Sequence, residues 1–368
     1  MIEAYVNLAR AHAPLLIVSL PFLGAAVAFA VNAPRASWVA AVLAASLAAV
    51  LGADFCGRFL LGAERGPLAQ EGLSIGADAL GAFSAALVAA AAACVVTSAA
   101  AFFQTIGRNS APFALALMLC VSGGWSGAAL ARDFTTFFVF VEIAWLSQVG
   151  LVALLAGAAR GALNGAQRML FLGGVASALL LIGVGLIERG LGGGDIASMA
   201  SVRIALPNTT SLGAALIIMA LALKAGLAPL NAWAAAAYGR AGGMGAVALG
   251  GLGVAGAVLA LAHIAAAASP SPAIGAGVGA ALSALGMLSA AIGSVQAIGA
   301  TTIWRLGAYA VSAQAGCALI GIGLGSAAAM YWSSEVRPSS IPAYGSSTFR
   351  PGMITARSVG HAAMRAVS

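Results

Sequence analysis

Long apolar stretches recur along the chain from residue 14 to residue 332. A helix needs about 20 apolar residues to cross the hydrocarbon core of a bilayer. The stretches that approach or exceed this length are residues 14–31, 37–54, 79–104, 111–131, 134–158, 169–187, 211–234, 242–264, 273–297 and 305–332. The sequence therefore predicts an all-α integral membrane protein with about ten transmembrane helices.

Charged residues make up 7% of the chain, whereas soluble domains carry about 25%. A chain with this small number of charged residues cannot cover a surface that faces water. The composition therefore predicts that the protein lies in a lipid bilayer. The net charge of +7 comes from arginines in the connections and near the C-terminus, a pattern that suits lipid headgroups. No basic stripe is interleaved with aromatic residues, so nucleic acid is not a predicted partner.

Small residues are abundant in the apolar stretches, and glycine alone occurs 48 times. In lipid, small residues let helix backbones approach closely and gain dispersion contacts. We therefore expect closely packed helices in one polytopic membrane domain over residues 1–332. Residues 333–368 turn polar and contain serine and proline, so we expect a basic C-terminal tail there.

Residue types that bind metals and cofactors are scattered rather than grouped. The cysteines and histidines are Cys56, Cys94, Cys120, Cys317, His12, His263 and His361, with no metal or haem spacing. The segment GLGVAG at 251–256 matches a dinucleotide-binding pattern, but it lies inside an apolar stretch without the acidic residue such a site needs. No cofactor, metal or catalytic residue is predicted, and any electron chemistry is expected to belong to partner subunits.

Glu142 and Lys224 lie well inside apolar stretches and His263 lies near the end of one, whereas Asp54, Asp78 and Asp133 stand at stretch ends. A charge at the centre of a membrane helix costs about 2.5–3.5 kcal/mol, so such residues pair or face water. Burial favours the neutral forms of Glu and Lys while pairing favours the charged forms, and a pair held in that balance suits a proton relay. The alternative is a static ion pair that fixes helix packing. His263, near the end of its stretch, fits an interfacial position better than a relay.

Lys224 is the only lysine in the chain, and Pro229 follows it by about one helical turn. Proline lacks an N–H and clashes with the preceding turn, so it breaks or kinks a helix. Backbone groups freed at membrane depth are tolerated only where protein or water satisfies them. We therefore expect a broken seventh helix with Lys224 beside the break, an arrangement also found in transporters.

Four segments carry motifs that occur in a fixed order. In LALKAGLAPLNAWAAAAY, the matching residues are Lys224, Gly226, Pro229 and Trp233. In the fifth stretch they are Asp133, Phe134, Phe137, Val139, Phe140 and Glu142, and in the tenth Arg305, Leu306, Ala308, Tyr309, Gln314 and Gly316. Asp78 opens the third. On these motifs, residues 70–330 resemble the antiporter-like proton-translocating subunits of respiratory complex I, Mrp antiporters and membrane-bound hydrogenases.

The resemblance implies a proton channel centred on an ion pair between Glu142 and Lys224. It implies that residues 111–264 form a complete first five-helix bundle, followed by a truncated second one. Supporting motif positions would be Asp133, Gly226, Pro229, Asn231, Trp233 and Arg305. Arginine would not serve in place of Lys224, because it keeps its proton at reachable pH. The implied partners are other membrane subunits of a larger energy-converting complex and hydrophilic redox subunits, in a bacterial inner membrane.

The sequence also departs from the family pattern. Asn231 stands where the family has histidine, and Val254 or Ala255 where it has a further channel lysine. No basic residue occurs from 241 to 262, so that step is missing unless His263 replaces it. Two functions therefore stay open: a proton- or cation-conducting subunit of an oxidoreductase or antiporter complex, or a non-conducting paralogue with a structural role in such a complex.

Overall fold

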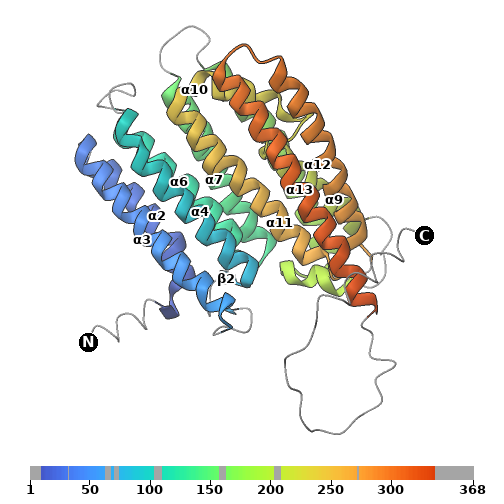
Figure 1. Ribbon diagram of the computed structural model, residues 1–368. Coiled ribbons are helices and arrows are strands. Elements are labelled where there is room, and N and C mark those ends of the chain that lie inside the picture. The colour runs from blue at the N-terminus through green and yellow to red at the C-terminus, as the bar shows by residue number, and fades with distance from the viewer. Residues whose placement is uncertain are drawn as a thin grey trace, which may run out of the picture. The chain divides into compact units, whose positions relative to one another are not determined.

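The computed structural model describes residues 10–31, 33–62, 68–69, 74–102, 110–156, 163–202, 209–271 and 273–335. Within these ranges the chain is almost entirely helical, and the long helices run side by side (Figure 1). Residues 336–368 lie outside the described part, so the division into a membrane domain and a polar tail stays a prediction.

The long helices follow one another through short connections. They are α2 (Ala13–Val31), α3 (Pro34–Leu60), α4 (Ala79–Ser98), α6 (Ala111–Ala129), α7 (Phe134–Leu155), α8 (Asn164–Leu191), α9 (Thr209–Lys224), α10 (Ala234–Ala248), α11 (Ala255–Ala268), α12 (Gly275–Ile298) and α13 (Ile303–Glu335). In Figure 1, α2 and α3 lie at one side and α12 and α13 at the other, with α7 and α11 between them.

Short elements connect or interrupt the helices. The 3₁₀ turns are η1 (Ala99–Phe102), η2 (Ile196–Ser201) and η3 (Asn231–Trp233), and η4 (Leu249–Val254) is a π-helical segment between α10 and α11. The two-residue strands β1 (Leu68–Ala69) and β2 (Gly76–Ala77) pair antiparallel. Isolated bridges Ile75–Ala131 and Asp133–Asp195 join three connections at the same end of the bundle.

Nine helices in the described ranges are long and apolar enough to cross a membrane. They account for every predicted stretch except 211–234, which is not one continuous helix. Its helical part, α9, has 16 residues and ends at Lys224. The physical reason is local, since Gly226 takes a left-handed φ of 63° and Pro229 has no N–H to donate.

Glycines bring two pairs of helices into backbone contact. A Cβ added at Gly183 of α8 would lie 2.8 Å from the carbonyl oxygen of Gly213 on α9, and the reverse holds for Gly213. Gly286 of α12 and Gly316 of α13 face each other in the same way, with each virtual Cβ 2.6 Å from the other residue's carbonyl oxygen. These contacts agree with the expected close packing through small residues.

Side chains from later helices satisfy the backbone groups freed by the break. Ser312 of α13 donates to the carbonyl oxygen of Gly226 at 2.7 Å. Ser289 of α12 accepts from the Ala228 N–H at 2.9 Å and donates to the Ser312 carbonyl oxygen at 2.9 Å. Trp233 closes the break on its other side, because its Nε1 donates to the Leu223 carbonyl oxygen at 2.8 Å. The break is thus a built feature, held by protein groups at membrane depth.

Replacing Ser312 with alanine is expected to destabilise the protein by about 1–3 kcal/mol, because it leaves the buried Gly226 carbonyl without its partner. The matched control is Ser294→Ala, since the exposed Ser294 on α12 bonds only to Ala290 of its own helix. Unfolding titrations in detergent would compare the two variants. Equal stability of both would mean that the hydroxyl of Ser312 does not hold the break.

Candidate functional site

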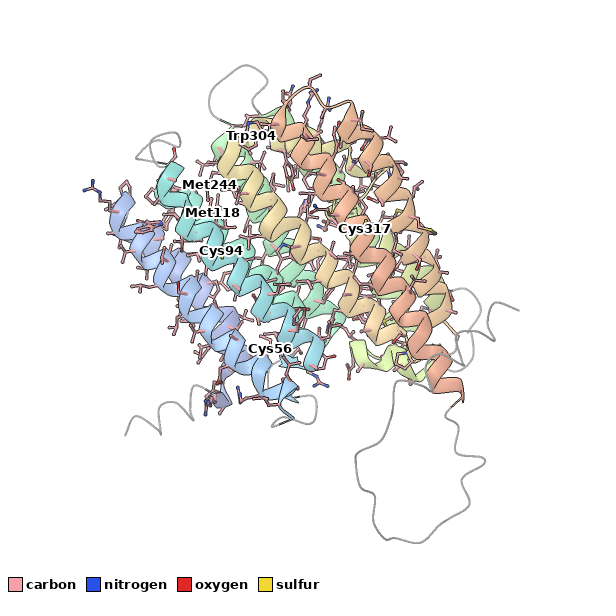
Figure 2. The ribbon with its side chains drawn as sticks, in the orientation of Figure 1. Cys56, Cys94, Met118, Met244, Trp304 and Cys317 are labelled. Carbon is pink, nitrogen blue, oxygen red and sulfur yellow. The ribbon has the colours of Figure 1, made fainter. Side chains whose placement is uncertain are left out.

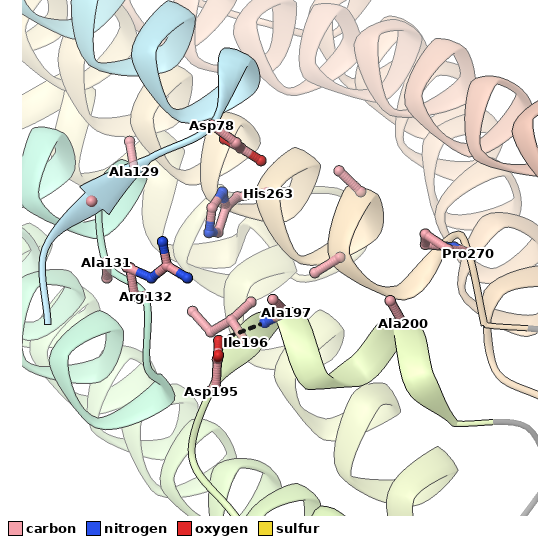
Figure 3. Close-up of a pocket in the computed structure, with 13 residues that line it drawn as sticks. Asp78, Ala129, Ala131, Arg132, Asp195, Ile196, Ala197, Ala200, His263 and Pro270 are labelled. Atoms are coloured by element: carbon pink, nitrogen blue, oxygen red, sulfur yellow. Dashed lines mark hydrogen bonds between the residues drawn. The ribbon is translucent and has the colours of Figure 1, made fainter. Parts of the chain in front are cut away.

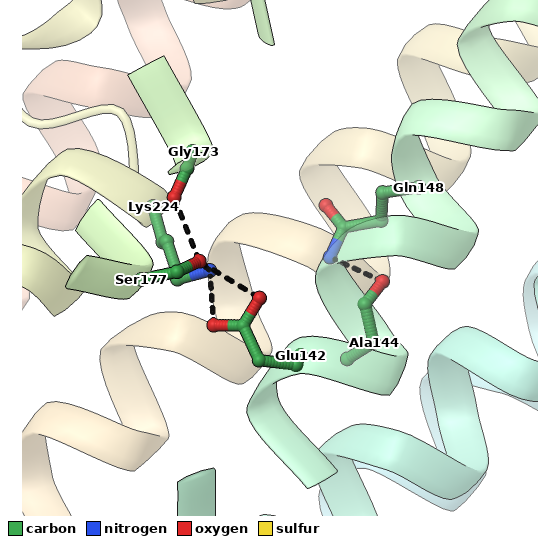
Figure 4. Close-up of polar contacts among 6 residues, drawn as sticks. All are labelled: Glu142, Ala144, Gln148, Gly173, Ser177 and Lys224. Atoms are coloured by element: carbon green, nitrogen blue, oxygen red, sulfur yellow. Dashed lines mark hydrogen bonds and ion pairs between the residues drawn. The ribbon is translucent and has the colours of Figure 1, made fainter. Parts of the chain in front are cut away.

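The single lysine of the chain meets Glu142 in the interior of the bundle. Lys224, the last residue of α9, places Nζ 2.9 Å from Oε1 of Glu142 in the middle of α7 (Figure 4). The Lys224 side chain is 0% exposed and that of Glu142 is 18% exposed. The pair is therefore asymmetric: its cation is fully buried, and its carboxylate stays partly exposed.

Ser177 of α8 completes a triangle with the pair. Its Oγ accepts from Lys224 Nζ at 3.1 Å and lies 2.8 Å from Oε2 of Glu142. The same Oγ lies 2.8 Å from the carbonyl oxygen of Gly173 in its own helix (Figure 4). A serine hydroxyl carries one proton, so it can donate to the carboxylate or to the carbonyl, but not to both at once. Ser177 can therefore follow a change in the charge of Glu142.

Two tryptophans close the pair off from the rest of the interior. Nζ of Lys224 lies 4.9 Å from the centroid of the Trp145 ring, a cation–π contact. Trp233 packs edge-on against Trp145, with centroids 5.2 Å apart and an angle of 88°. Gly173 makes room for this arrangement, because any side chain there would collide with the Trp145 indole. The aromatic wall limits water at Lys224 and fixes the direction of its ammonium group.

Gln148 lies one turn beyond Trp145 and is buried on α7. Its Nε2 donates to the carbonyl oxygen of Ala144 at 3.3 Å (Figure 4). The π-helical segment η4 passes directly beside it, and a Cβ at Gly253 would collide with the Gln148 amide. Gln148 thus presents a polar group to the stretch of chain that has no basic residue.

Asp133 stands at the start of α7 rather than at the ion pair. Its carboxylate accepts from the N–H and the hydroxyl of Thr136 at 2.7 and 2.8 Å, which makes it the N-cap of that helix. Burial raises the pKa of Asp133, but hydrogen bonds from Ser74 and Thr136 outweigh it, and the pKa lies below its ordinary value. The residue is therefore ionised at neutral pH and anchors the helix that carries Glu142.

The remaining predicted residues divide between the break and more distant places. Asn231 is buried in η3 and donates to Oε1 of Gln296 on α12 at 2.7 Å. Pro229 lies exposed in the break, and Arg305 is exposed in the first turn of α13. His263, near the end of α11, stacks on Phe137 with centroids 6.5 Å apart. None of these four residues has a described contact with Glu142 or Lys224.

Sequence reasoning missed Ser177, Trp145, Ser289 and Ser312. Polar residues inside apolar stretches were the available signal for the three serines. That signal is weak, because a serine in a membrane helix can bond to the carbonyl four residues earlier, as Ser177 also does. Which serines reach across to another helix depends on helix rotation, which the sequence pattern does not fix.

The described residues offer no cluster of three or more His, Cys, Asp and Glu side chains that could hold a metal ion. Cys56, Cys94 and Cys317 lie on separate helices (Figure 2), and all four cysteines are free. Four scattered thiols cannot serve as a cluster-binding set. The absence of a bound cofactor stays a prediction.

Residues 131–334 match the family described as "NADH:quinone oxidoreductase/Mrp antiporter, TM". The chain belongs to this family. The matched region begins just before Asp133 and contains Glu142, Lys224 and the whole broken segment. The resemblance predicted from the motifs is confirmed.

Individual relatives come from both branches named in the family description. A component of a probable K(+)/H(+) antiporter from Rhizobium meliloti (strain 1021) is 31% identical over 218 residues, which cover 57% of this chain and 40% of that protein. NADH-quinone oxidoreductase subunit N of Desulforudis audaxviator (strain MP104C) is 29% identical over 226 residues, 59% of this chain and 43% of that protein. The chain spans about two fifths of the length of these curated relatives.

Solved structures share the fold at low identity. A chain of the archaeal membrane-bound sulfane sulfur reductase superposes with a TM-score of 0.73 at 22% identity, covering 84% of this chain and 64% of that one. A chain of the Mrp complex from Dietzia sp. DQ12-45-1b gives 0.72 at 24%, covering 86% and 59%. A chain of complex I from Thermus thermophilus gives 0.65 at 21%, covering 86% and 70%. The antiporter-like fold of an integral membrane protein is thereby confirmed.

Proposed function

We propose that the chain is a proton-conducting subunit of a larger energy-converting membrane complex. The observation that carries this proposal is the contact between Glu142 and Lys224 in the bundle interior. A charge is expensive at membrane depth, and a residue of that cost marks a functional site by default. The choice of lysine supports proton exchange over simple pairing, because arginine forms better buried ion pairs but does not release its proton.

The geometry suggests how the pair would exchange protons. Glu142 is the partly exposed member, so a proton arrives there first. Neutralising its carboxylate removes the charge that holds Lys224 in the ammonium form. Ser177 then turns its hydroxyl from Glu142 toward the Gly173 carbonyl, which lies at the same distance. Lys224, left buried without a counter-ion, then gives up a proton, and transfer of the proton on Glu142 to the neutral Lys224 amine restores the ion pair.

Partners follow from the family and stay part of the proposal. The relatives named above are parts of antiporters and NADH-quinone oxidoreductases, and the structural neighbours come from multi-subunit membrane complexes. We infer that this chain assembles with other membrane subunits and, in the oxidoreductase case, with hydrophilic redox subunits. The bacterial origin of these relatives supports a bacterial inner membrane as its location.

A non-conducting structural role is the second candidate. It is favoured by the stretch 241–262, which has no basic residue. In the described structure, the Gln148 amide and the Tyr238 hydroxyl are polar groups that lie against the π-helical segment there. A neutral amide can order water but does not take up a proton at ordinary pH. In this case Glu142 and Lys224 would only hold α7 and α9 together.

Purification under native conditions tests the proposal. The protein would be isolated in mild detergent, its partners identified by mass spectrometry, and the intact assembly reconstituted into liposomes. We expect co-purifying membrane subunits of the oxidoreductase or antiporter type and proton movement coupled to their reaction. An assembly with unrelated membrane proteins, or one that moves no protons, would contradict the conducting role.

A further inference from the structure

We propose that a cavity at one end of the bundle, lined by Asp78, Arg132, Asp195 and His263, is the water-filled mouth through which protons enter or leave. This inference rests on the proposed function, because it gives the proton-exchanging pair an opening to water. The cavity has a volume of about 210 Å³, enough for several water molecules. None of the motifs in the sequence pointed to it as a unit.

The cavity forms where four separate segments meet. Asp78 caps α4, Arg132 lies between α6 and α7, Asp195 caps η2, and His263 lies on α11. Figure 3 shows the guanidinium of Arg132 and the ring of His263 turned into the same space, with Asp78 and Asp195 on either side. Connections bridged to one another surround it, so the cavity belongs to the ordered end of the bundle.

Arg132 indicates that the cavity holds water. Within the described residues, its guanidinium makes no hydrogen bond and no ion pair, although it is only partly exposed. A charged group without a protein partner needs water around it, above all at the end of membrane helices. Neither neighbouring carboxylate pairs with it in the described structure: Asp78 accepts from the Gly81 N–H at 2.7 Å and Asp195 from the Ala197 N–H at 2.9 Å. Water is therefore the partner that the arrangement requires.

His263 of α11 lines the cavity. It stacks on Phe137 of α7, with the two rings 15° from parallel. Phe137 is fully buried and precedes Glu142 by five residues, about 7.5 Å along the helix axis. Histidine is the side chain that exchanges protons most readily near neutral pH. The cavity thus has a titratable ring in its lining, and this ring stacks on a buried residue of α7, the helix that carries Glu142.

The mixed charge of the lining favours protons over a bound ion. Two carboxylates stand against one guanidinium and one imidazole, so neither an anion nor a metal cation meets a matching field. This combination fits a passage for protons and water better than a ligand site.

Cysteine labelling in membranes tests whether the cavity holds water. Two single-cysteine versions of the full chain would be compared in a background without other cysteines: Ala267→Cys, which lines the cavity, and a version that retains only Cys317. Cys317 is exposed in the middle of α13, where lipid is expected. A charged, membrane-impermeant methanethiosulfonate should modify Ala267→Cys about tenfold faster or more, because only a hydrated thiolate reacts.

Measurements on the reconstituted complex then test whether protons pass through the cavity. Modification of Ala267→Cys should cut proton translocation about tenfold or more, because the added group fills the cavity, while treatment of the Cys317 version should leave it unchanged. Equal, slow labelling of both would mean a dry cavity and overturn the proposal, and so would fast labelling with unchanged translocation. An unmodified complex that moves no protons would overturn the proposed function as well, and it is recognised before any reagent is added.

Discussion

Replacing Lys224 with alanine is expected to reduce proton translocation by the assembled complex about 100-fold or more, and Lys224→Arg is expected to do the same. Loss of a positioned acid or base typically costs this much. Alanine removes the proton carrier, whereas arginine preserves the charge beside Glu142 and the cation over Trp145 but holds its proton too tightly. Translocation would be measured in liposomes with a pH-sensitive dye while the partner reaction runs.

The arginine variant separates the two candidate functions. In a static pair, arginine would restore both assembly and any activity, because a guanidinium satisfies Glu142 and Ser177 at least as well. Co-purification of partner subunits serves as the control for folding. Removing one partner of a buried pair costs about 3–5 kcal/mol when the other is left charged. The Glu142 side chain is 18% exposed and so is not fully desolvated, and the alanine variant should therefore lose less stability than this. If Lys224→Arg translocated protons at the wild-type rate, the result would contradict a proton relay through Lys224.

Replacing Gly316 with alanine is expected to destabilise the protein by about 1–3 kcal/mol, the usual cost of overpacking. The new Cβ would lie 2.6 Å from the Ala290 nitrogen and 2.6 Å from the Gly286 carbonyl oxygen, and neither backbone group can move alone. Helices α12 and α13 must then separate, which also displaces Ser289 from the break that it satisfies. Unfolding of the purified protein in detergent would measure the loss.

Gly321→Ala provides the matched control on the same helix. A Cβ there meets nothing within 4 Å, so the change should be neutral or stabilising by up to about 1 kcal/mol. A stability loss for Gly321→Ala as large as that for Gly316→Ala would mean that helix propensity, and not backbone contact between α12 and α13, explains both results.

Much of the fold could be predicted because a bilayer imposes strong local rules. Each span must be helical and apolar over about 20 residues, so nine of the spans follow from composition alone. Lys224 and Pro229 could also be recognised locally, because a lysine is unusual in an apolar stretch and a proline interrupts a helix. The broken helix was predicted for the right reason, but its extent was not: α9 ends at Lys224 itself, because Gly226 turns the chain before Pro229 is reached.

Only those residues of the candidate site that are unusual for their position in the sequence could be predicted. Glu142 and Lys224 were conspicuous as charges in apolar stretches, and the family motifs paired them. Ser177 was not, because a serine is ordinary in a membrane helix and its partners lie 35 and 47 residues away in sequence. The same holds for the wall formed by Trp145 and Trp233, which depends on how three helices rotate against one another.

The sequence by itself therefore determined that this is a membrane protein and where its helices lie along the chain. It also identified Glu142 and Lys224 as the two residues whose charges are costly to bury in a membrane. Tertiary structure alone decided that Ser177 joins the ion pair, that Ser289 and Ser312 fill the break, and that His263 faces a cavity instead of the pair. The physical reason is the difference between properties of consecutive residues and contacts between residues that are distant in sequence. Hydrophobic length is a property of consecutive residues, whereas the partner of a polar group at membrane depth is chosen by helix rotation and by the close approach that glycine permits.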